Sequence, residues 1–249
     1  MDTVLYFDKP LGWTSFNLVN RVRGVLSRHL GVKKLKVGHA GTLDPLATGV
    51  MILCTGKNTK LIESFQYQTK EYIATIKLGA TTPSFDLETE IDAEYPTEHI
   101  TEQLVKETLE KFIGEIQQVP PTYSAIKING KRAYEYARKG EEVEMKTKTL
   151  VIDKIELLEY NMPEIVVRVV CSKGTYIRAL ARDIGQALGS GGHLTALRRT
   201  QIGDIRVENC QQYEDFVKEL GILRVSESND KLASALPSVS KIIKASLDS

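Results

Sequence analysis

Asp44 is the side chain whose setting is best suited to chemistry. It is the only acid between Lys9 and Lys60, and it lies in the glycine-rich residues 38–49, directly before the apolar run 50–54. Glycine and proline favour an irregular path that is neither helix nor ladder strand, and the apolar run predicts a buried strand. A lone carboxylate on a loop anchored by a core strand is where a catalytic group is expected. Asp before Pro also opens ordinary turns, so the dipeptide alone leaves both interpretations open.

Other kinds of site find little support in the residue spacing. Gly56-Lys57-Asn58 lacks the Ser or Thr that follows the lysine of a P-loop. A glycosidase pair would need Asp44 beside one of the acids of residues 83–115, and no pattern places them together. The histidines form no His-x-x-x-His pair, so we predict no metal site; they are His29, His39, His99 and His193.

Charge lies in blocks, although the net charge is only +1. Residues 9–43 hold seven basic and no acidic side chains, and residues 168–206 hold seven basic and two acidic ones. Residues 83–115 hold ten acids and two lysines. A basic face near Asp44 favours a polyanionic partner, because phosphate contacts dominate nucleic-acid affinity. The alternative interpretation is a set of solvated helix faces.

The elements that must position Asp44 follow from apolar periodicity. Residues 4–7 predict a short strand, and Ser15 is the expected N-cap of a helix that ends at Gly31. Residues 58–65 predict a second helix. Residues 71–78 alternate in the way of a half-buried strand, with Tyr72 on the apolar side.

The later part of the chain predicts more elements of both kinds. Residues 101–112 and 176–188 have the apolar period of helices, and residues 151–158 and 165–171 have that of strands. The acidic residues 83–96 predict a surface loop. Because helices and strands are mixed without regular βαβ units, the predicted fold class is α+β.

Residues 117–150 differ from their surroundings, because they are polar, basic and poor in core residues. They contain Asn129-Gly130, which is a strong hairpin signal, and a short predicted helix at residues 132–139. We interpret this segment as a projecting flap.

Bulk properties indicate a cytoplasmic globular protein. At 249 residues the chain can bury the core of one large or two small domains. No apolar run is long enough to span a bilayer, and the first residues lack the pattern of a signal peptide. The three cysteines are widely spaced and are expected to be reduced thiols; they are Cys54, Cys171 and Cys210.

Residues 38–49, Gly-His-Ala-Gly-Thr-Leu-Asp-Pro-Leu-Ala-Thr-Gly, resemble the catalytic signature of the TruB family of pseudouridine synthases. The resemblance extends to about Val207. Residues 9–15 resemble the family's N-terminal motif, residues 70–72 the strand with its active-site tyrosine, residues 171–178 the segment with its active-site arginine, and residues 194–200 a motif that lines the pocket.

The resemblance implies the pseudouridine synthase fold: a mixed, mainly antiparallel sheet flanked by helices and loops, with a flap that grips RNA. It implies that the enzyme flips uridine 55 out of the T-arm loop of tRNA and isomerises it without a cofactor or metal. Asp44 is then the nucleophile and Arg178 its ion-pair partner, while Tyr72 stacks on the base and accepts a proton. His39 takes the place of the flipped nucleotide. Further implied substrate-binding residues are Lys9, Tyr176 and Leu197.

We expect a catalytic domain over residues 1–225, with the flap at about 117–150, and a tail of residues 226–249. Such a tail is too short for the PUA-type domain of many relatives, so tRNA docking would fall to the basic helix and the flap. Removal of residues 226–249 should then leave most activity. The resemblance implies a monomer that binds the T-arm stem-loop of tRNA and does not associate with a membrane. The alternatives are an RNA-guided rRNA synthase, or a tRNA-folding chaperone with incidental catalysis.

Overall fold

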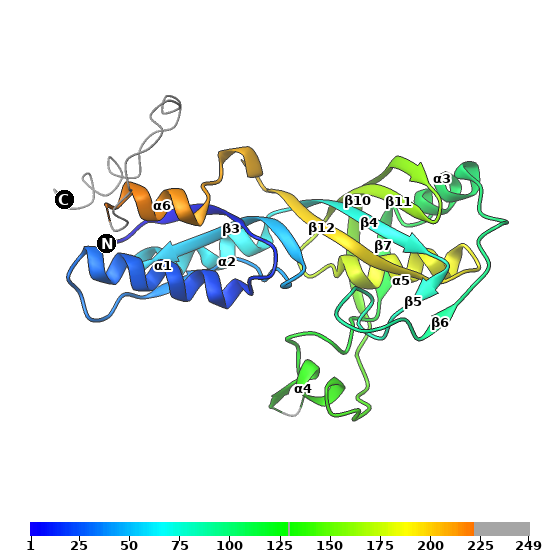
Figure 1. Cartoon of the computed structure of the whole chain (residues 1–249), viewed down its shortest axis with the longest axis horizontal. Coiled ribbons are helices and arrows are strands. Elements are labelled where there is room, and N and C mark those ends of the chain that lie inside the picture. Colours follow the sequence, from blue (N-terminus) through cyan, green and yellow to red (C-terminus); the bar gives the residue numbers. More distant parts are fainter. Residues whose placement is uncertain (129, 222–249) are drawn as a thin grey trace, which may run out of the picture. The chain divides into compact units, whose positions relative to one another are not determined.

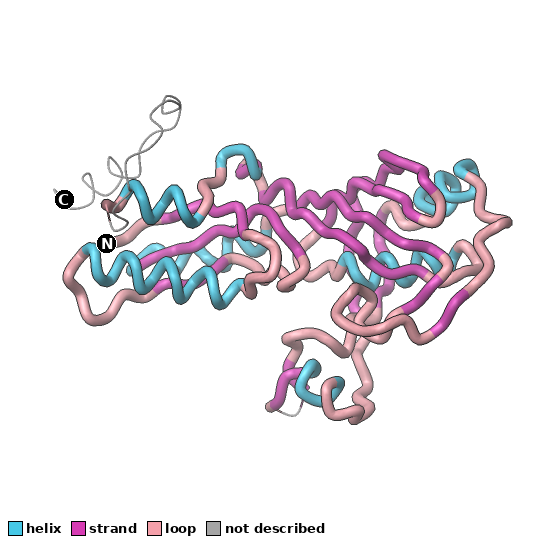
Figure 2. The backbone as a smooth tube through the Cα atoms, in the orientation of Figure 1, coloured by secondary structure: helices cyan, strands magenta, loops and turns pink. Residues whose placement is uncertain are grey.

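The structure, a computed structural model, describes residues 1–128 and 130–221. It contains two compact units (Figure 1): unit 1 comprises residues 1–68 and the chain from Arg199 onwards, and unit 2 comprises residues 69–198. Helices and strands are mixed in both units (Figure 2), which confirms the α+β class. The expected tail of residues 226–249 lies outside the described residues.

The centre of unit 1 is the strand β3 (Ala47–Thr55), which is buried over almost its whole length. Strand β1 (Val4–Lys9) and strand β2 (Val37–His39) both pair with it in the antiparallel sense. Cys54 pairs with Val4 of β1 and with Gly38 of β2, so β3 lies between them. The predicted buried strand after Asp44 is therefore confirmed.

The prediction that all of residues 38–49 avoid ladder structure is wrong at both ends. Gly38 and His39 belong to β2, and Gly49 pairs with Lys9 of β1. Gly38 fits because a Cβ atom there would lie 2.6 Å from the Ile62 side chain. Within residues 38–49, only residues 40–46 lie outside the paired strands, so Asp44 is on a shorter loop than the glycine content indicated.

Helix α1 (Ser15–His29) buries its predicted apolar stripe, and Gly31 follows it with a φ of +65°. Its N-cap is Thr14 and not the predicted Ser15: the Thr14 hydroxyl accepts from the Asn17 backbone N–H, and the Asn17 side chain accepts from the Thr14 N–H. The other elements of unit 1 are a 3₁₀ turn (Gly56–Leu61), α2 (Ile62–Tyr67), the end of β12 (Gly192–Ile202), β13 (Ile205–Arg206), a second 3₁₀ turn (Val207–Asn209) and α6 (Tyr213–Glu219).

Unit 2 is built on an antiparallel sheet in the order β4 (Lys70–Leu78), β11 (Glu164–Cys171), β10 (Lys148–Asn161) and β7 (Gly114–Gln118). Alternate residues of β4 are buried, as predicted, and they include Tyr72. Two helices, α3 (Glu102–Glu110) and α5 (Ile177–Ala187), contact this sheet and each other. The start of β12, up to Arg198, also belongs to unit 2.

The predicted flap forms its own small substructure in unit 2. Strands β8 (Lys127–Ile128) and β9 (Lys131–Arg132) pair in the antiparallel sense as a hairpin, and α4 (Ala133–Ala137) follows. The predicted hairpin and short helix are thereby confirmed. The acidic residues 83–96 are only partly the surface loop that was predicted. Strand β6 (Ala93–Glu94) pairs with β5 (Ala80–Thr81), and Ser84 and Asp86 are buried.

Candidate active site

The residues predicted to form the site are divided between the two units. Unit 1 contains Lys9, His39 and Asp44. Unit 2 contains Tyr72, Tyr176, Arg178 and Leu197. Each group has a structural setting that can be described separately.

The Asp44 loop is held by hydrogen bonds on both sides of the aspartate. The Ser15 hydroxyl donates to the Leu43 carbonyl (2.9 Å) and accepts from the Leu43 N–H (2.8 Å). The Gly12 N–H donates to the Pro45 carbonyl (2.8 Å), and the Ala47 N–H donates to the Asp44 carbonyl (3.1 Å). Because its neighbours are fixed in this way, Asp44 has a defined backbone position although it lies on a loop.

Arg199 lies inside unit 1 against the same loop, with only 1% of its surface exposed. Its Nε donates to the Val50 carbonyl of β3 (2.8 Å). Its two terminal nitrogens donate to the carbonyls of Gly41 (3.2 Å) and Thr42 (3.3 Å). A single guanidinium therefore joins the loop that precedes Asp44 to the central strand.

Lys9 is fully buried, and its Nζ donates to the carbonyls of Pro10 (2.9 Å) and Trp13 (2.7 Å). Burial lowers the pKa of Lys9 to about 8; the charge of Asp44 opposes this shift and that of Arg199 adds to it. Lys9 would therefore affect a substrate through the turn that it holds and through its charge.

His39, at the end of β2, is partly exposed. Burial is the main cause that lowers its pKa; a backbone hydrogen bond to Gly41 opposes this effect, and the charge of Arg199 adds to it. The lowered pKa favours the uncharged imidazole, which is a flat aromatic ring.

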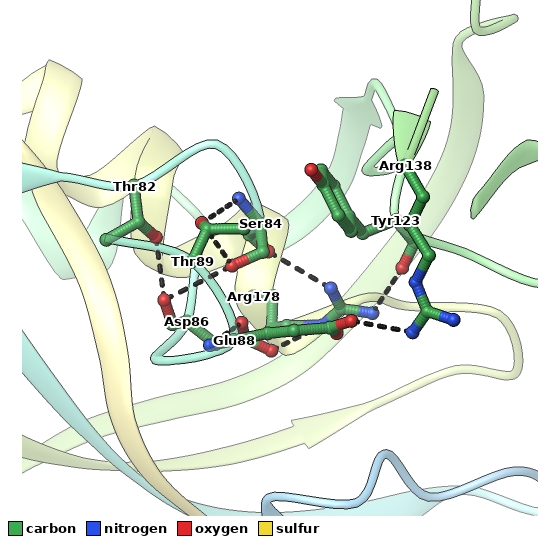
Figure 3. Close-up of polar contacts among 8 residues, drawn as sticks. All are labelled: Thr82, Ser84, Asp86, Glu88, Thr89, Tyr123, Arg138 and Arg178. Carbon is green, nitrogen blue, oxygen red and sulfur yellow. Dashed lines mark hydrogen bonds and ion pairs between the residues drawn. The ribbon is translucent and has the colours of Figure 1, made fainter. Parts of the chain in front are cut away.

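In unit 2, Arg178 lies in the first turn of α5 with 4% of its surface exposed. Its terminal nitrogens donate to the carbonyls of Ser84 (3.0 Å) and Tyr123 (2.9 Å), and its Nε lies 3.5 Å from a carboxylate oxygen of Asp86 (Figure 3). The buried charge is thus met by a carboxylate and by carbonyls, as buried cations require.

The loop that holds Arg178 is itself tightly bonded (Figure 3). The hydroxyls of Thr82 (2.7 Å) and Ser84 (3.2 Å) both donate to the Asp86 carbonyl. Phe85, between Ser84 and Asp86, has a φ of +63°, a conformation that bulky residues rarely adopt. Its ring lies under the Arg182 guanidinium, 4.6 Å from centroid to Cζ. This turn directs both the Ser84 carbonyl and the Asp86 carboxylate to the same guanidinium.

The flap is connected to this loop through an ion pair at its surface. Arg138, which follows α4, donates to Glu88 at 2.9 Å (Figure 3). Tyr123, near the start of the flap, provides the carbonyl that Arg178 contacts. The flap, the acidic loop and the start of α5 therefore meet at Arg178.

The remaining predicted residues of unit 2 lie on regular elements. Tyr72 is on the buried face of β4 with 8% of its surface exposed, and Leu197 is half-buried on β12. Tyr176 directly precedes α5, where Gln118 donates to its carbonyl (3.2 Å) and accepts from its N–H (2.9 Å). Gln118 thereby fixes the start of the helix that carries Arg178.

Sequence reasoning missed the residues that hold the candidate groups. Asp86 was one of ten acids in a block, and nothing marked it as the buried one. Gln118 belongs to the segment expected to be poor in core residues. Arg199 was noticed only as part of a motif expected to line the pocket.

Two further observations concern metal ions and membranes. Within residues 1–128 and 130–221, no three His, Cys, Asp or Glu side chains gather so that they could hold a metal ion. In the same part of the chain, no helix is both long and apolar enough to cross a membrane. What the two settings offer is a positioned carboxylate, a buried guanidinium, aromatic rings and a neutral imidazole.

Comparison with known proteins adds to this geometry. Residues 27–177 match the family model of the TruB family pseudouridylate synthase N-terminal domain. Residues 178–243 match that of the tRNA pseudouridylate synthase B C-terminal domain. Among solved structures, a Cbf5-Nop10-Gar1 complex contains a similar chain, with a TM-score of 0.64 and 29% identity over 87% of this chain. This chain spans about half (54%) of the length of that solved chain.

Curated relatives match over nearly their whole length. A protein of Phocaeicola vulgatus named tRNA pseudouridine synthase B is 70% identical over 90% of this chain and 95% of its own. One of Bacteroides fragilis with the same name is 72% identical over 86% of this chain and 92% of its own. The fold is therefore the pseudouridine synthase fold that the sequence predicted, and the chain belongs to the TruB family of pseudouridine synthases.

Proposed function

We propose that this protein isomerises uridine to pseudouridine at position 55, in the T-arm loop of tRNA. The observation that carries the proposal is the Asp44 loop: a single carboxylate within a motif of the matched family, on a backbone that hydrogen bonds hold on both sides of Asp44. The names of relatives at 70% and 72% identity support tRNA as the substrate.

Asp44 acts as the nucleophile and must be ionised to do so. The buried ammonium of Lys9 favours the charged carboxylate, since the two charges attract. We assign Arg178 as the ion-pair partner of Asp44, because a guanidinium both lowers a carboxyl pKa and fixes its rotamer. In the reaction, the bond between N1 of uracil and C1′ of the ribose breaks, uracil turns, and a bond forms between C5 and C1′. C5 loses its proton and N1 gains one, so that the product is an isomer of the substrate.

The substrate uridine must leave the folded loop before its glycosidic bond is accessible. His39, neutral and flat, fills the space that the base leaves. Tyr72 stacks on the flipped base and accepts the proton from C5. Lys9, Tyr176 and Leu197 complete the substrate-binding set. The isomerisation needs no cofactor as electron or group carrier, because it involves neither redox change nor transfer of an external group.

The wider assignments follow from the substrate. Residues 1–225 form the catalytic domain, and the flap and the basic outer face of α1 contact the tRNA phosphates. The enzyme acts as a monomer in the cytoplasm. Residues 226–249 contribute little to activity.

A second candidate is an RNA-guided synthase. Its support is the similarity to chains in solved structures titled as a Cbf5-Nop10-Gar1 complex and as an H/ACA RNP bound to a substrate RNA. Activity on tRNA without any guide RNA would separate the two candidates.

The test is tritium release from an unmodified tRNA transcript labelled at uridine C5, with wild type and Asp44→Asn measured in parallel. We expect release of about one tritium per tRNA by wild type and none by Asp44→Asn, which keeps the side-chain size and removes the charge. A wild type that binds tRNA tightly and releases no tritium would overturn the catalytic assignment in favour of a tRNA-folding chaperone.

A further inference from the structure

Arg199 is the largest fully buried side chain of the described residues, and all the hydrogen bonds described for it go to backbone carbonyls. Placing a guanidinium in the interior is costly unless its N–H groups find acceptors. Its acceptors are Val50, which lies on the central strand, and Gly41 and Thr42, which lie on the loop. Aliphatic residues could fill this volume, so the cation has a role beyond packing.

The loop segment that Arg199 contacts leads directly to Asp44. Gly41 and Thr42 precede Leu43, whose two backbone groups are bonded to Ser15. Arg199 thus fixes Gly41 and Thr42, whereas Ser15 fixes Leu43. Without its donors, the carbonyls of Gly41 and Thr42 would lose the bonds that tie them to β3.

Gly49 indicates that the chain is adapted to the position of Arg199. Its φ is +108°, and a Cβ atom there would lie 2.1 Å from the Arg199 carbonyl oxygen. Only glycine permits this approach of β3 to the Arg199 backbone. The backbone of Arg199, from which the guanidinium extends, therefore has a closely determined position.

We propose that Arg199 is a positioning residue for catalysis, which sets the place of the Asp44 carboxylate by holding the carbonyls of Gly41 and Thr42 against β3. The inference rests on the proposed role of Asp44. Arg199 is too deeply buried to bind RNA, in contrast to Leu197, two residues earlier on β12, which is half-buried.

The test compares Arg199→Lys and Arg199→Met with wild type under single turnover, using the tritium-labelled tRNA, together with tRNA binding by filter retention. Lysine keeps a buried cation but lacks the planar fork that reaches three carbonyls. We expect both variants to react about 10- to 100-fold more slowly, because displacement of a catalytic group by about 1 Å has effects of this size. The dissociation constant for tRNA should stay within about threefold.

A stability-matched control separates positioning from folding. Phe216→Leu removes part of a fully buried ring that contacts the ring of Phe7 in the same unit. All rates are measured well below the unfolding temperature of each variant. If Arg199→Met does not fold, Arg199→Lys alone still tests the proposal. Wild-type rates for Arg199→Lys, or equal slowing of Phe216→Leu, would overturn the proposal. An inactive wild type would instead overturn the proposed function.

Discussion

Three buried cations, Lys9, Arg178 and Arg199, lie beside the groups proposed for catalysis. Each donates to backbone carbonyls, Arg199 to those of both the loop and strand β3, and only Arg178 has a described carboxylate contact of its own unit, with Asp86. Such groups contribute little net stability compared with well-packed aliphatic residues, while loss of one partner is expensive. In unit 1, the burial of Lys9 and Arg199 is better explained by the need to hold the turn and the loop beside Asp44. In unit 2, the carbonyls and the carboxylate around Arg178 fix that guanidinium in the same way.

Asp86 and Glu88 lie on the same loop and provide a matched pair of substitutions. Asp86→Asn removes the carboxylate charge beside the buried Arg178 and should lower the free energy of unfolding by about 3 kcal/mol. Glu88→Gln removes only the surface ion pair with Arg138 and should change it by less than about 1 kcal/mol. Urea unfolding measures both values, and equal small changes would contradict the assignment of a buried pair.

Lys9 predicts a pH dependence of stability. Its pKa falls from 10.5 to about 8 on folding, so between these values the unfolded chain binds more protons than the native one. The free energy of unfolding therefore rises with pH across this window, by at most about 1.4 kcal/mol per pH unit. Below pH 8 both states are protonated, and the cost of burying the charge remains in full.

Lys9→Met removes this titrating group and serves as the reference for that prediction. The stability of wild type minus that of Lys9→Met should increase from pH 8 to pH 10.5 in urea unfolding measured at several pH values. A constant difference would mean that the ammonium keeps its usual pKa in the folded protein.

At the scale of elements, the first turn of α1 divides two tasks between neighbouring hydroxyl residues. Thr14 caps the helix, and Ser15 turns inward to bond Leu43. The sequence could not distinguish them, since both are good N-cap residues. In the structure, Thr14 holds the helix end and Ser15 holds the Asp44 loop.

Thr14→Ala and Ser15→Ala should therefore have different effects. Loss of the cap in Thr14→Ala should cost about 1 kcal/mol of stability and leave the single-turnover rate unchanged. Ser15→Ala leaves the cap in place and frees both backbone groups of Leu43, so the rate should fall about tenfold or more. If Thr14→Ala slows the reaction as much as Ser15→Ala, the two tasks are not separate.

The elements were largely predictable because burial repeats along the chain. The alternation of β4 and the stripes of α1 and α5 are visible in the sequence, and the structure confirms them. The supporting contacts were not predictable, because they join residues far apart, such as Thr42 and Arg199 at a separation of 157 residues. Gly38 and Gly49 were wrongly predicted to lie outside strands for a related reason. Both lie in paired strands, where the missing side chain lets another part of the chain come close.

At the scale of the whole molecule, the proposed catalytic set draws on two compact units, and the flap belongs to unit 2. The flap has few buried residues and carries exposed cations such as Lys127 and Lys131. Lys131 also lies 5.8 Å from the Tyr136 ring centroid. This combination of exposed cations and aromatic rings is typical of surfaces that bind nucleic acid.

Neutralising Lys127 and Lys131 together with Gln should weaken tRNA binding and make it less dependent on salt. Each lost phosphate contact reduces the slope of log K against log salt by about 0.7 to 0.9. The matched control is the double change of Lys106 and Lys111 to Gln, two exposed lysines in and directly after α3 of the same unit. Equal slopes for the two double variants would contradict a specific role of the flap.

The bond between the Leu43 N–H and the Ser15 hydroxyl also affects how quickly the loop exchanges hydrogen with water. Loop amides usually exchange within local fluctuations, whereas this amide is released only when α1 and the Asp44 loop separate. Deuterium uptake at Leu43 therefore reports the opening of the Asp44 loop directly. The exchange rate of this amide measures how often the loop opens, whereas activity measurements detect the opening only through its effect on the reaction rate.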